Sequence, residues 1–350
     1  MAQWRPVALA LLIGMAGATI GSGLSFPAPW LTGPALSVTL GSLAGLKLAI
    51  PTTLRNACFI VVGMTIGASV TPEMVATVMQ WPASILILFI AMIAIMAVGA
   101  MMLERGFGYN RVTAVLGAAP GHLSFVLGLS TSISKVDVMA VSVIQSTRVL
   151  VLTLAVPLLA VVLTGGTLAD AIPDGTPMTP LILVVTGVAA FCVAYALWLL
   201  RAPAAFLLGG ILASSVGHLT SALPGLVPIW ISIPAFIVMG TLIGTRFSGV
   251  ALAEIRKAAL AALAFTAVSL LIATVACLVT AFVLDVPLVQ SMVAYAPGGL
   301  EAMAAMALLL GVNPAFVAAH HISRLLLLAI LIPLVLRRAG HGKPNRHNPE

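Results

Sequence analysis

Three charged side chains are embedded in apolar sequence, and they are the strongest candidates for ion binding or proton transfer. Glu301 lies in the stretch YAPGGLEAMAAM. Arg148 and Arg324 each lie 11 residues beyond a polar residue, Asp137 and Asn313 respectively. At ~1.5 Å per helical residue each arginine is then roughly 16 Å into its helix, near the centre of a bilayer. A central arginine costs about 2.5–3.5 kcal/mol even on the lenient insertion scale, so each needs a partner or a wet cavity.

Two interpretations of these charges are open. One carboxylate against two guanidiniums leaves a positive charge, which a bound anion would satisfy. In that hypothesis Arg148 and Arg324 hold substrate oxygens, and Glu301 titrates as a proton-coupling group. In the structural alternative, either arginine binds Glu301 or the backbone carbonyls that a broken helix sets free.

Two Pro-Gly pairs interrupt apolar segments. Pro120 and Gly121 lie in GAAPGHLSF, and Pro297 and Gly298 lie in YAPGGLEAM. Proline removes a donor and clashes with the preceding turn, so each helix should break there. A break at membrane depth is tolerated only inside protein or beside a water-filled cavity, and the next half-helix offers free amides to an anion. One packed proline kink would be the structural explanation, but two equivalent breaks favour a functional site.

Four further polar residues fall close to the breaks or the arginines. His122 follows the first Pro-Gly pair, and Ser124 stands where the second half has Glu301. Gln145 and His321 lie one turn before the arginines, on the same helical face. The predicted substrate-binding residues are therefore Pro120, Gly121, His122, Ser124, Gln145, Arg148, Pro297, Gly298, His321 and Arg324, with Glu301 as the proton-coupling residue.

The chain as a whole is too apolar to remain in water. Of its 350 residues 61% are hydrophobic and 7% are charged, and the mean hydropathy is +1.19. An ordinary soluble domain is about a quarter charged. Apolar runs of roughly 20 residues recur from end to end, which predicts an all-α, polytopic transmembrane helical bundle. The apolar stretch behind Arg5 resembles a signal peptide, but another apolar run begins near Leu31, so we expect a retained first helix.

The sequence also repeats itself with a period of 177 residues. FIVVGMTIGASV, starting at Phe59, matches FIVMGTLIGTRF, starting at Phe236, and AAPGHLSF matches YAPGGLEA at the same offset. Repeated matches at one period indicate an internal duplication. The expected organisation is a first membrane repeat over 1–164, a linker loop over 165–179, a second membrane repeat over 180–338 and a basic tail over 339–350.

The basic residues predict the topology, because short cytoplasmic loops collect Lys and Arg. About twelve apolar segments are expected. If segments 112–130 and 287–310 enter and return on the same side, each half crosses five times and the loop bases all face the cytoplasm, as do both termini. An odd number of crossings makes the halves inverted copies, as in many secondary transporters. Lys47, Arg55 and Arg246 flank helices and are expected to be interfacial anchors.

Metal and cofactor chemistry finds no pattern in the sequence. His320 and His321 are adjacent, so on a helix they point about 100° apart and make a poor chelating pair. There is no Gly-Lys-Ser/Thr loop of an ATPase. Cys58, Cys192 and Cys277 lie in apolar runs, where cysteine packs as a small hydrophobic residue. We therefore expect no metal and no cofactor.

With GAAPGHLSF and STR in one half, and YAPGGLEAM and HHISRLLLL in the other, the sequence resembles the AbrB family of bacterial inner-membrane proteins. The resemblance covers essentially the whole chain and implies the bacterial inner membrane. Members are often labelled ammonia monooxygenases or regulators of gene expression, and no substrate or catalytic residue is implied. The first label is unsupported because no histidines and carboxylates have copper- or iron-ligand spacing. The second lacks a recognisable nucleic-acid-binding segment.

We therefore expect a secondary transporter or exporter of a small anionic solute that works by alternating access, with proton coupling as an option, and not an enzyme. Two alternatives stay open. One is a membrane regulator that acts without flux, and the other is a membrane enzyme in which Glu301 and His122 act as acid and base. The expected partners are the solute and the lipid bilayer, with no nucleic acid, and a homodimer is left open.

Overall fold

The computed structural model describes residues 4–76, 78, 81–120, 126, 129–130, 133, 136–165 and 175–338. These residues form fourteen helices and no strand, apart from an isolated bridge between Pro177 and Leu226. The prediction of an all-α bundle is therefore confirmed.

Six helices are long and apolar enough to cross a bilayer. They are α1 (Arg5–Gly23), α5 (Trp81–Phe107), α8 (Val138–Leu163), α9 (Pro180–Leu199), α12 (Leu252–Leu284) and α15 (Pro314–Arg338). The chain is accordingly a multi-pass membrane protein. The other expected segments are shorter than the ~20 residues that a 30 Å hydrocarbon layer asks of a straight helix.

Four of these shorter helices pack closely through glycine. They are α2 (Pro29–Leu43), α3 (Thr52–Ala68), α10 (Ala205–Leu219) and α11 (Ile229–Thr245). A Cβ added to Gly63 of α3 would meet the backbone of Leu207 and Gly210 in α10. A Cβ added to Gly240 of α11 would meet the backbone of Leu31 in α2. The two glycines begin the motifs GMTIG and GTLIG, in which small residues four apart let helix backbones approach.

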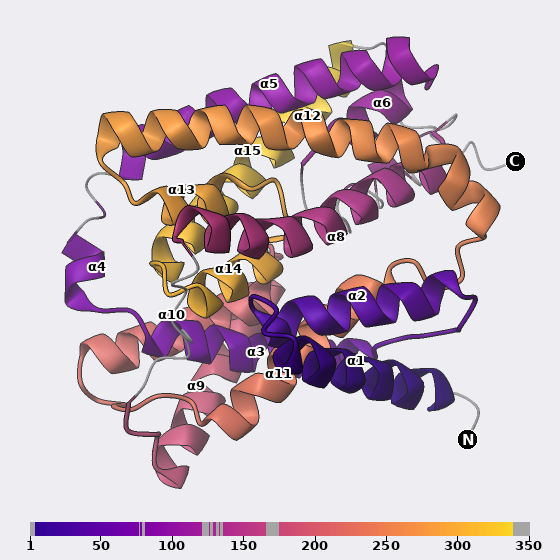
Figure 1. Ribbon diagram of the computed structural model, residues 1–350. Helices are drawn as coiled ribbons and strands as arrows, with labels where there is room; N and C mark the ends of the chain where they lie inside the picture. The colour runs from indigo at the N-terminus through magenta and orange to yellow at the C-terminus, as the bar shows by residue number, and fades with distance from the viewer. Residues whose placement is uncertain are drawn as a thin grey trace, which may run out of the picture.

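The helices form two bundles with few contacts between them (Figure 1). The first bundle contains α1, α2, α3, α9, α10 and α11, which are the first three helices of each predicted repeat. The second bundle contains α5, α6 (Arg111–Ala118), α8, α12, α13 (Leu288–Tyr295) and α15, while the short α4 (Pro72–Ala76) follows α3. Helix α14 (Leu300–Leu309) lies between them, against α3 and α11 on one side and α8 and α15 on the other.

Pairing between helices is reciprocal in the two halves. Helix α3 packs on α10, and its counterpart α11 packs on α2, the counterpart of α10. In the same way α1 packs on α2 and α9 on α10, while α5 packs on α6 and α12 on α13. A duplicated chain would pair in this manner. The division into repeats at 165–179 stays a prediction.

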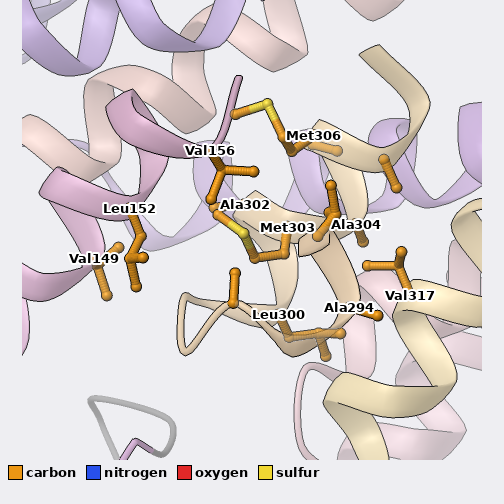
Figure 2. Packing of buried hydrophobic residues seen from close by; sticks show 14 of the residues in the cluster. Val149, Leu152, Val156, Ala294, Leu300, Ala302, Met303, Ala304, Met306 and Val317 are labelled. Carbon is orange, nitrogen blue, oxygen red and sulfur yellow. The ribbon is translucent and has the colours of Figure 1, made fainter. Parts of the chain in front are cut away.

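Helix α14 is buried between the two bundles along most of its length. Nine of its ten residues are buried, and Glu301 is the partly exposed exception. Figure 2 shows Val156 of α8 facing Ala302 and Met303 of α14, with Val317 of α15 on the other side. This packing buries the middle of the helix, whereas Glu301 near its N-terminal end and Leu308 near its C-terminal end each line a cavity.

Replacing Gly63 by valine should destabilise the protein by about 1–3 kcal/mol, because the new side chain overlaps the backbone of α10. The midpoint of thermal unfolding in detergent measures the loss. Gly187→Val in α9 is the matched control, since an added Cβ there meets nothing within 4 Å. Equal midpoints for the two variants would contradict the close packing of α3 on α10.

Candidate functional site

Both Pro-Gly pairs end a helix. Helix α6 stops one residue before Ala119, and α13 stops one residue before Ala296. Both residues are extended, with ψ of 112° and 125°, because the residue before a proline is disfavoured in helical conformation. After Pro297 the chain resumes as α14, whose N-cap is Gly299. The predicted break is therefore present in the second half, and its N-terminal side is present in the first.

Three residues assigned to the site from sequence lie outside the described residues. They are Gly121, His122 and Ser124. The half-helix expected after Pro120 falls in the same part of the chain, so these assignments stay predictions.

Each broken segment begins and ends at the same end of its bundle. Asn313, which caps α15, donates its backbone N–H to Oε1 of Gln290 in the first turn of α13, over 3.4 Å. Asp137, which caps α8, donates its N–H to Oγ1 of Thr113 in the first turn of α6, over 3.0 Å. The chain thus returns to where each segment began, the geometry that five crossings per half would need.

Arg324 of α15 binds the carbonyls that the second break exposes. Its Nη1 donates to the carbonyl oxygen of Ala296 over 3.0 Å, and its Nη2 donates to that of Gly298 over 2.5 Å. One turn earlier, Nε2 of His321 lies 3.1 Å from the carbonyl oxygen of Val293. The last carbonyls of a helix have no partner within it, so these side chains complete the end of α13.

Helix α8 completes the end of α6 in the same way. Gln145 donates Nε2–H to the carbonyl oxygens of Leu116 and Ala119, over 2.9 and 2.6 Å. Arg148 donates from Nη1 to Ala119 over 3.4 Å and from Nη2 to Oε1 of Gln145 over 2.8 Å. These carbonyls lie 177 residues before those of Val293 and Ala296, so the two halves cap equivalent atoms.

The two arginines therefore bind the interrupted backbone and hold it in place. We call each arginine, together with the carbonyl or carbonyls that it binds, a clasp. Arg148 and Arg324 are 0% and 1% exposed, and within the described residues each leaves only Nε without a hydrogen-bond partner. Their contacts are those of the structural alternative, namely freed carbonyls. Neither arginine, nor Gln145 or His321, is among the described residues that line the cavity next to Glu301. A role for these four in binding substrate stays a prediction.

Tyr295, immediately before the break, is held by a buried polar network. Its hydroxyl donates to the carbonyl oxygen of Ser84 in α5 over 2.5 Å and accepts from Thr280 in α12 over 2.6 Å. The Ser84 hydroxyl lies 2.8 Å from Nε2 of His320 in α15. The network joins four helices and fixes where α13 ends. His320 has a structural role in this network.

Glu301 lines a cavity of about 430 Å³, which we call the Glu301 cavity. This volume is within the ~300–1,000 Å³ typical of small-molecule sites. The cavity lies where the first bundle meets α14 and α8. Its polar lining residues are Thr52, Arg55, Asn56, Arg246 and Glu301, and its larger apolar ones are Phe59, Val149, Trp198, Phe206, Met239, Leu242 and Ile243.

Arg55 and Arg246, which the sequence predicts to be interfacial anchors, both line this cavity. Arg55 donates from Nε and Nη2 to Oδ1 of Asn56, over 3.2 and 3.1 Å. Arg246 ends α11, and its buried Nη1 has no hydrogen-bond partner among the described residues. One signal in the sequence could have found it, because Arg246 stands where the first repeat has Ser69.

The N-terminal end of α14 faces the same cavity. The first hydrogen bond of the helix runs from Met303 N–H to the carbonyl oxygen of Gly299, so the amides before Met303 have no acceptor within the helix. Gly299 and Ala302 both line the cavity. The negative charge of Glu301 acts on Arg246, which lies at the same cavity. The site thus combines two guanidiniums, one carboxylate and a helix N-terminus.

A second cavity, of about 480 Å³, lies at the opposite ends of the same helices. We call it the His218 cavity. Helices α3, α10 and α14 contribute their N-terminal residues to the Glu301 cavity and the C-terminal residues Ala68, His218 and Leu308 to this one. Both cavities are lined by residues of the first bundle together with residues of α14.

Comparison with known proteins shows which family the chain resembles over most of its length. The family model described as "Transition state regulatory protein AbrB" matches residues 30–340. The chain is 24% identical over 325 residues to "Putative regulator AbrB" of Escherichia coli (strain K12), covering 91% of this chain and 92% of that protein. It is 23% identical over 297 residues to "Uncharacterized protein YhjN" of Bacillus subtilis (strain 168), covering 80% and 77%.

Arg324→Met should lower stability, because it leaves two buried carbonyls without donors at about 1–3 kcal/mol each. Thermal unfolding in detergent measures the loss. His321→Gln is the matched control: it gives the second half the amide that Gln145 supplies in the first, and should keep most of the stability. A wild-type midpoint for Arg324→Met would show that the clasp does not hold the break.

Proposed function

Since the chain belongs to the AbrB family and is a multi-pass membrane protein, we propose that it is a secondary transporter of a small anionic solute. The observation that carries the proposal is the pair of cavities at opposite ends of α3, α10 and α14. A transporter needs a site that is reached from either side of the membrane in turn, and two end cavities on shared helices supply that arrangement.

The two bundles supply the moving parts in this proposal. Few contacts join them (Figure 1). Among the described residues, each cavity is lined by residues of the first bundle and of α14, together with one residue of the second bundle, Val149 in the Glu301 cavity and Pro314 in the His218 cavity. A shift of one bundle against the other opens one cavity as it closes the other, which is how rigid-body alternating access works. Helix α14 is ~15 Å long and links the two cavities, so its N-terminal end is the proposed solute site.

The charges favour an anion. Arg55 and Arg246 outnumber the single carboxylate of Glu301, and the α14 N-terminus adds partial positive charge. An anion at this position would meet charge-assisted donors, whereas a cation would meet two guanidiniums. Arg148 and Arg324 act indirectly, because they keep the interrupted backbone in place.

Glu301 is the proposed proton-coupling residue. Its charge acts on Arg246 and on Arg324, so protonation of Glu301 strengthens the positive field at the cavity. A proton and an anion would then favour the same loaded state. This linkage couples solute movement to a proton gradient without a further cofactor.

The basic loops gather at the end with the Glu301 cavity. Leu48 donates its N–H to Oγ of Ser248 over 2.8 Å, and Ala49 donates its N–H to the carbonyl oxygen of Pro6 over 3.4 Å. These bonds join the loops that carry Lys47 and Arg246 to the start of α1. By the positive-inside rule this end is proposed to face the cytoplasm of a bacterial inner membrane.

A regulatory role is the other function to consider, because the Escherichia coli relative is named "Putative regulator AbrB". Transport of a metabolite that a separate regulator senses would produce such an effect indirectly. A scaffold without flux would need neither the charged cavity nor its counterpart at the other end. A membrane enzyme would turn over its substrate in detergent, where no gradient exists.

Glu301→Gln tests the transport proposal. Comparing metabolites of a deletion strain with those of an overexpressing strain identifies the solute, whose flux is then measured in proteoliposomes with and without a pH gradient. The variant should lose the stimulation by the gradient while solute exchange at equal pH partly persists. Arg256→Gln, an exposed position in the first turns of α12, is the control and should behave as the wild type. Normal gradient-dependent flux in Glu301→Gln would refute the coupling role.

A further inference from the structure

We infer that the Glu301 cavity takes a monocarboxylate that carries an apolar, ring-sized body. The inference rests on the proposed function, because it names the class of solute that the same cavity would bind. Three features of the cavity carry it: one available guanidinium, a carboxylate that is already compensated, and an aromatic lining.

Arg246 provides the docking point for one carboxylate. It lines the cavity, and its buried Nη1 is without a hydrogen-bond partner in the described part of the chain. The guanidinium of Arg55 is occupied by Asn56, and it lies 6.0 Å from the ring centroid of Phe59. A guanidinium fork matches the two oxygens of a carboxylate, and the amides at the start of α14 add further donors. The unpartnered Nη1 of Arg246 and the amides at the start of α14 can together bind one carboxylate.

Glu301 disfavours a second anionic group and does not provide a site for an ammonium group. A dianion would place its second charge near the Glu301 carboxylate. That carboxylate is already compensated, because it acts on Arg246 and Arg324 and lies in the first turn of α14. The ammonium of an amino acid would therefore gain little here. A monocarboxylate without an amino group fits the charges better than a zwitterion.

The remaining residues that line the cavity favour a solute with an apolar group attached to its carboxylate. Phe59, Trp198 and Phe206 come from three different helices and bring aromatic rings to one cavity. Leu242 and Ile243 of α11 extend the apolar surface next to Arg246. Phosphate, sulfate or acetate would leave this surface unused, whereas a ring attached to the carboxylate would bury it. The charge selects the headgroup and the aromatic lining selects the body.

Equilibrium binding to the full chain in lipid nanodiscs tests the inference, with empty nanodiscs as the blank. The probe is 3-phenylpropanoate, compared by calorimetry with its uncharged amide, with acetate, with inorganic phosphate and with phenylalanine. The probe should bind about tenfold or more tightly than each of the four, because each lacks the headgroup charge or the ring, or adds an ammonium group.

Two variants place the probe in the cavity. Arg246→Gln should weaken binding of 3-phenylpropanoate by about tenfold, the loss of one charge-assisted contact. Phe206→Ala should weaken binding of 3-phenylpropanoate and leave acetate unchanged, and it keeps the test decisive if Arg246→Gln does not fold. Arg256→Gln is the matched control, since Arg256 is exposed on α12 and lies outside the described cavity lining.

The outcomes separate this inference from the proposed function. Equal or tighter binding of phosphate, acetate or phenylalanine, or no binding of 3-phenylpropanoate, would overturn the monocarboxylate assignment and leave anion transport standing. Binding in the expected order, with no movement of the bound probe into proteoliposomes, would uphold the assignment and overturn transport.

Discussion

The structure depends on how interrupted helices keep their backbone hydrogen bonds in an apolar interior. Unpaired carbonyls cannot turn to water there, so each break needs donors from a neighbouring helix. Arg324 and Arg148 provide them at equivalent carbonyls, with His321 and Gln145 one turn earlier. Burying two guanidiniums is costly. Arg324 is held by two backbone oxygens, and Arg148 by one backbone oxygen and the side-chain oxygen of Gln145. The arginines and the breaks therefore stabilise each other.

The clasp also decides where the cavity forms. Because α13 stops at Tyr295, the chain can begin a new helix at Leu300, with its free amides and Glu301 at the start. That start meets Arg246 at the end of α11, where the two bundles come together. Close glycine contacts join α3 to α10 and α2 to α11, so these helices of the first bundle are tightly packed against one another. The charged residues, the helix break and the boundary between the two bundles are therefore found at the same cavity.

The parts of this arrangement that are local in the chain can be predicted from the sequence. Proline chemistry identified the breaks, helical spacing placed Gln145 and His321 beside the arginines, and the 177-residue period related the halves. From the sequence, two roles are open for Arg148 and Arg324, and substrate binding is the favoured one. In the structure, both arginines contact backbone carbonyls. The sequence does not place Arg246 in the cavity, because a basic residue at a helix end is ambiguous until the packing of α11 against α14 is known.

In the proposed transport mechanism the two cavities open in turn, and cysteine labelling from each side of the membrane can detect this. Ala302→Cys probes the Glu301 cavity and Ser69→Cys the His218 cavity, each with Cys192→Ser, since Cys58 and Cys277 are buried. A membrane-impermeant maleimide is applied from each side of oriented vesicles. Alternating access predicts reciprocal changes, in which conditions that speed labelling at position 302 slow labelling at position 69. Labelling rates that stay constant, or that rise together, would contradict it.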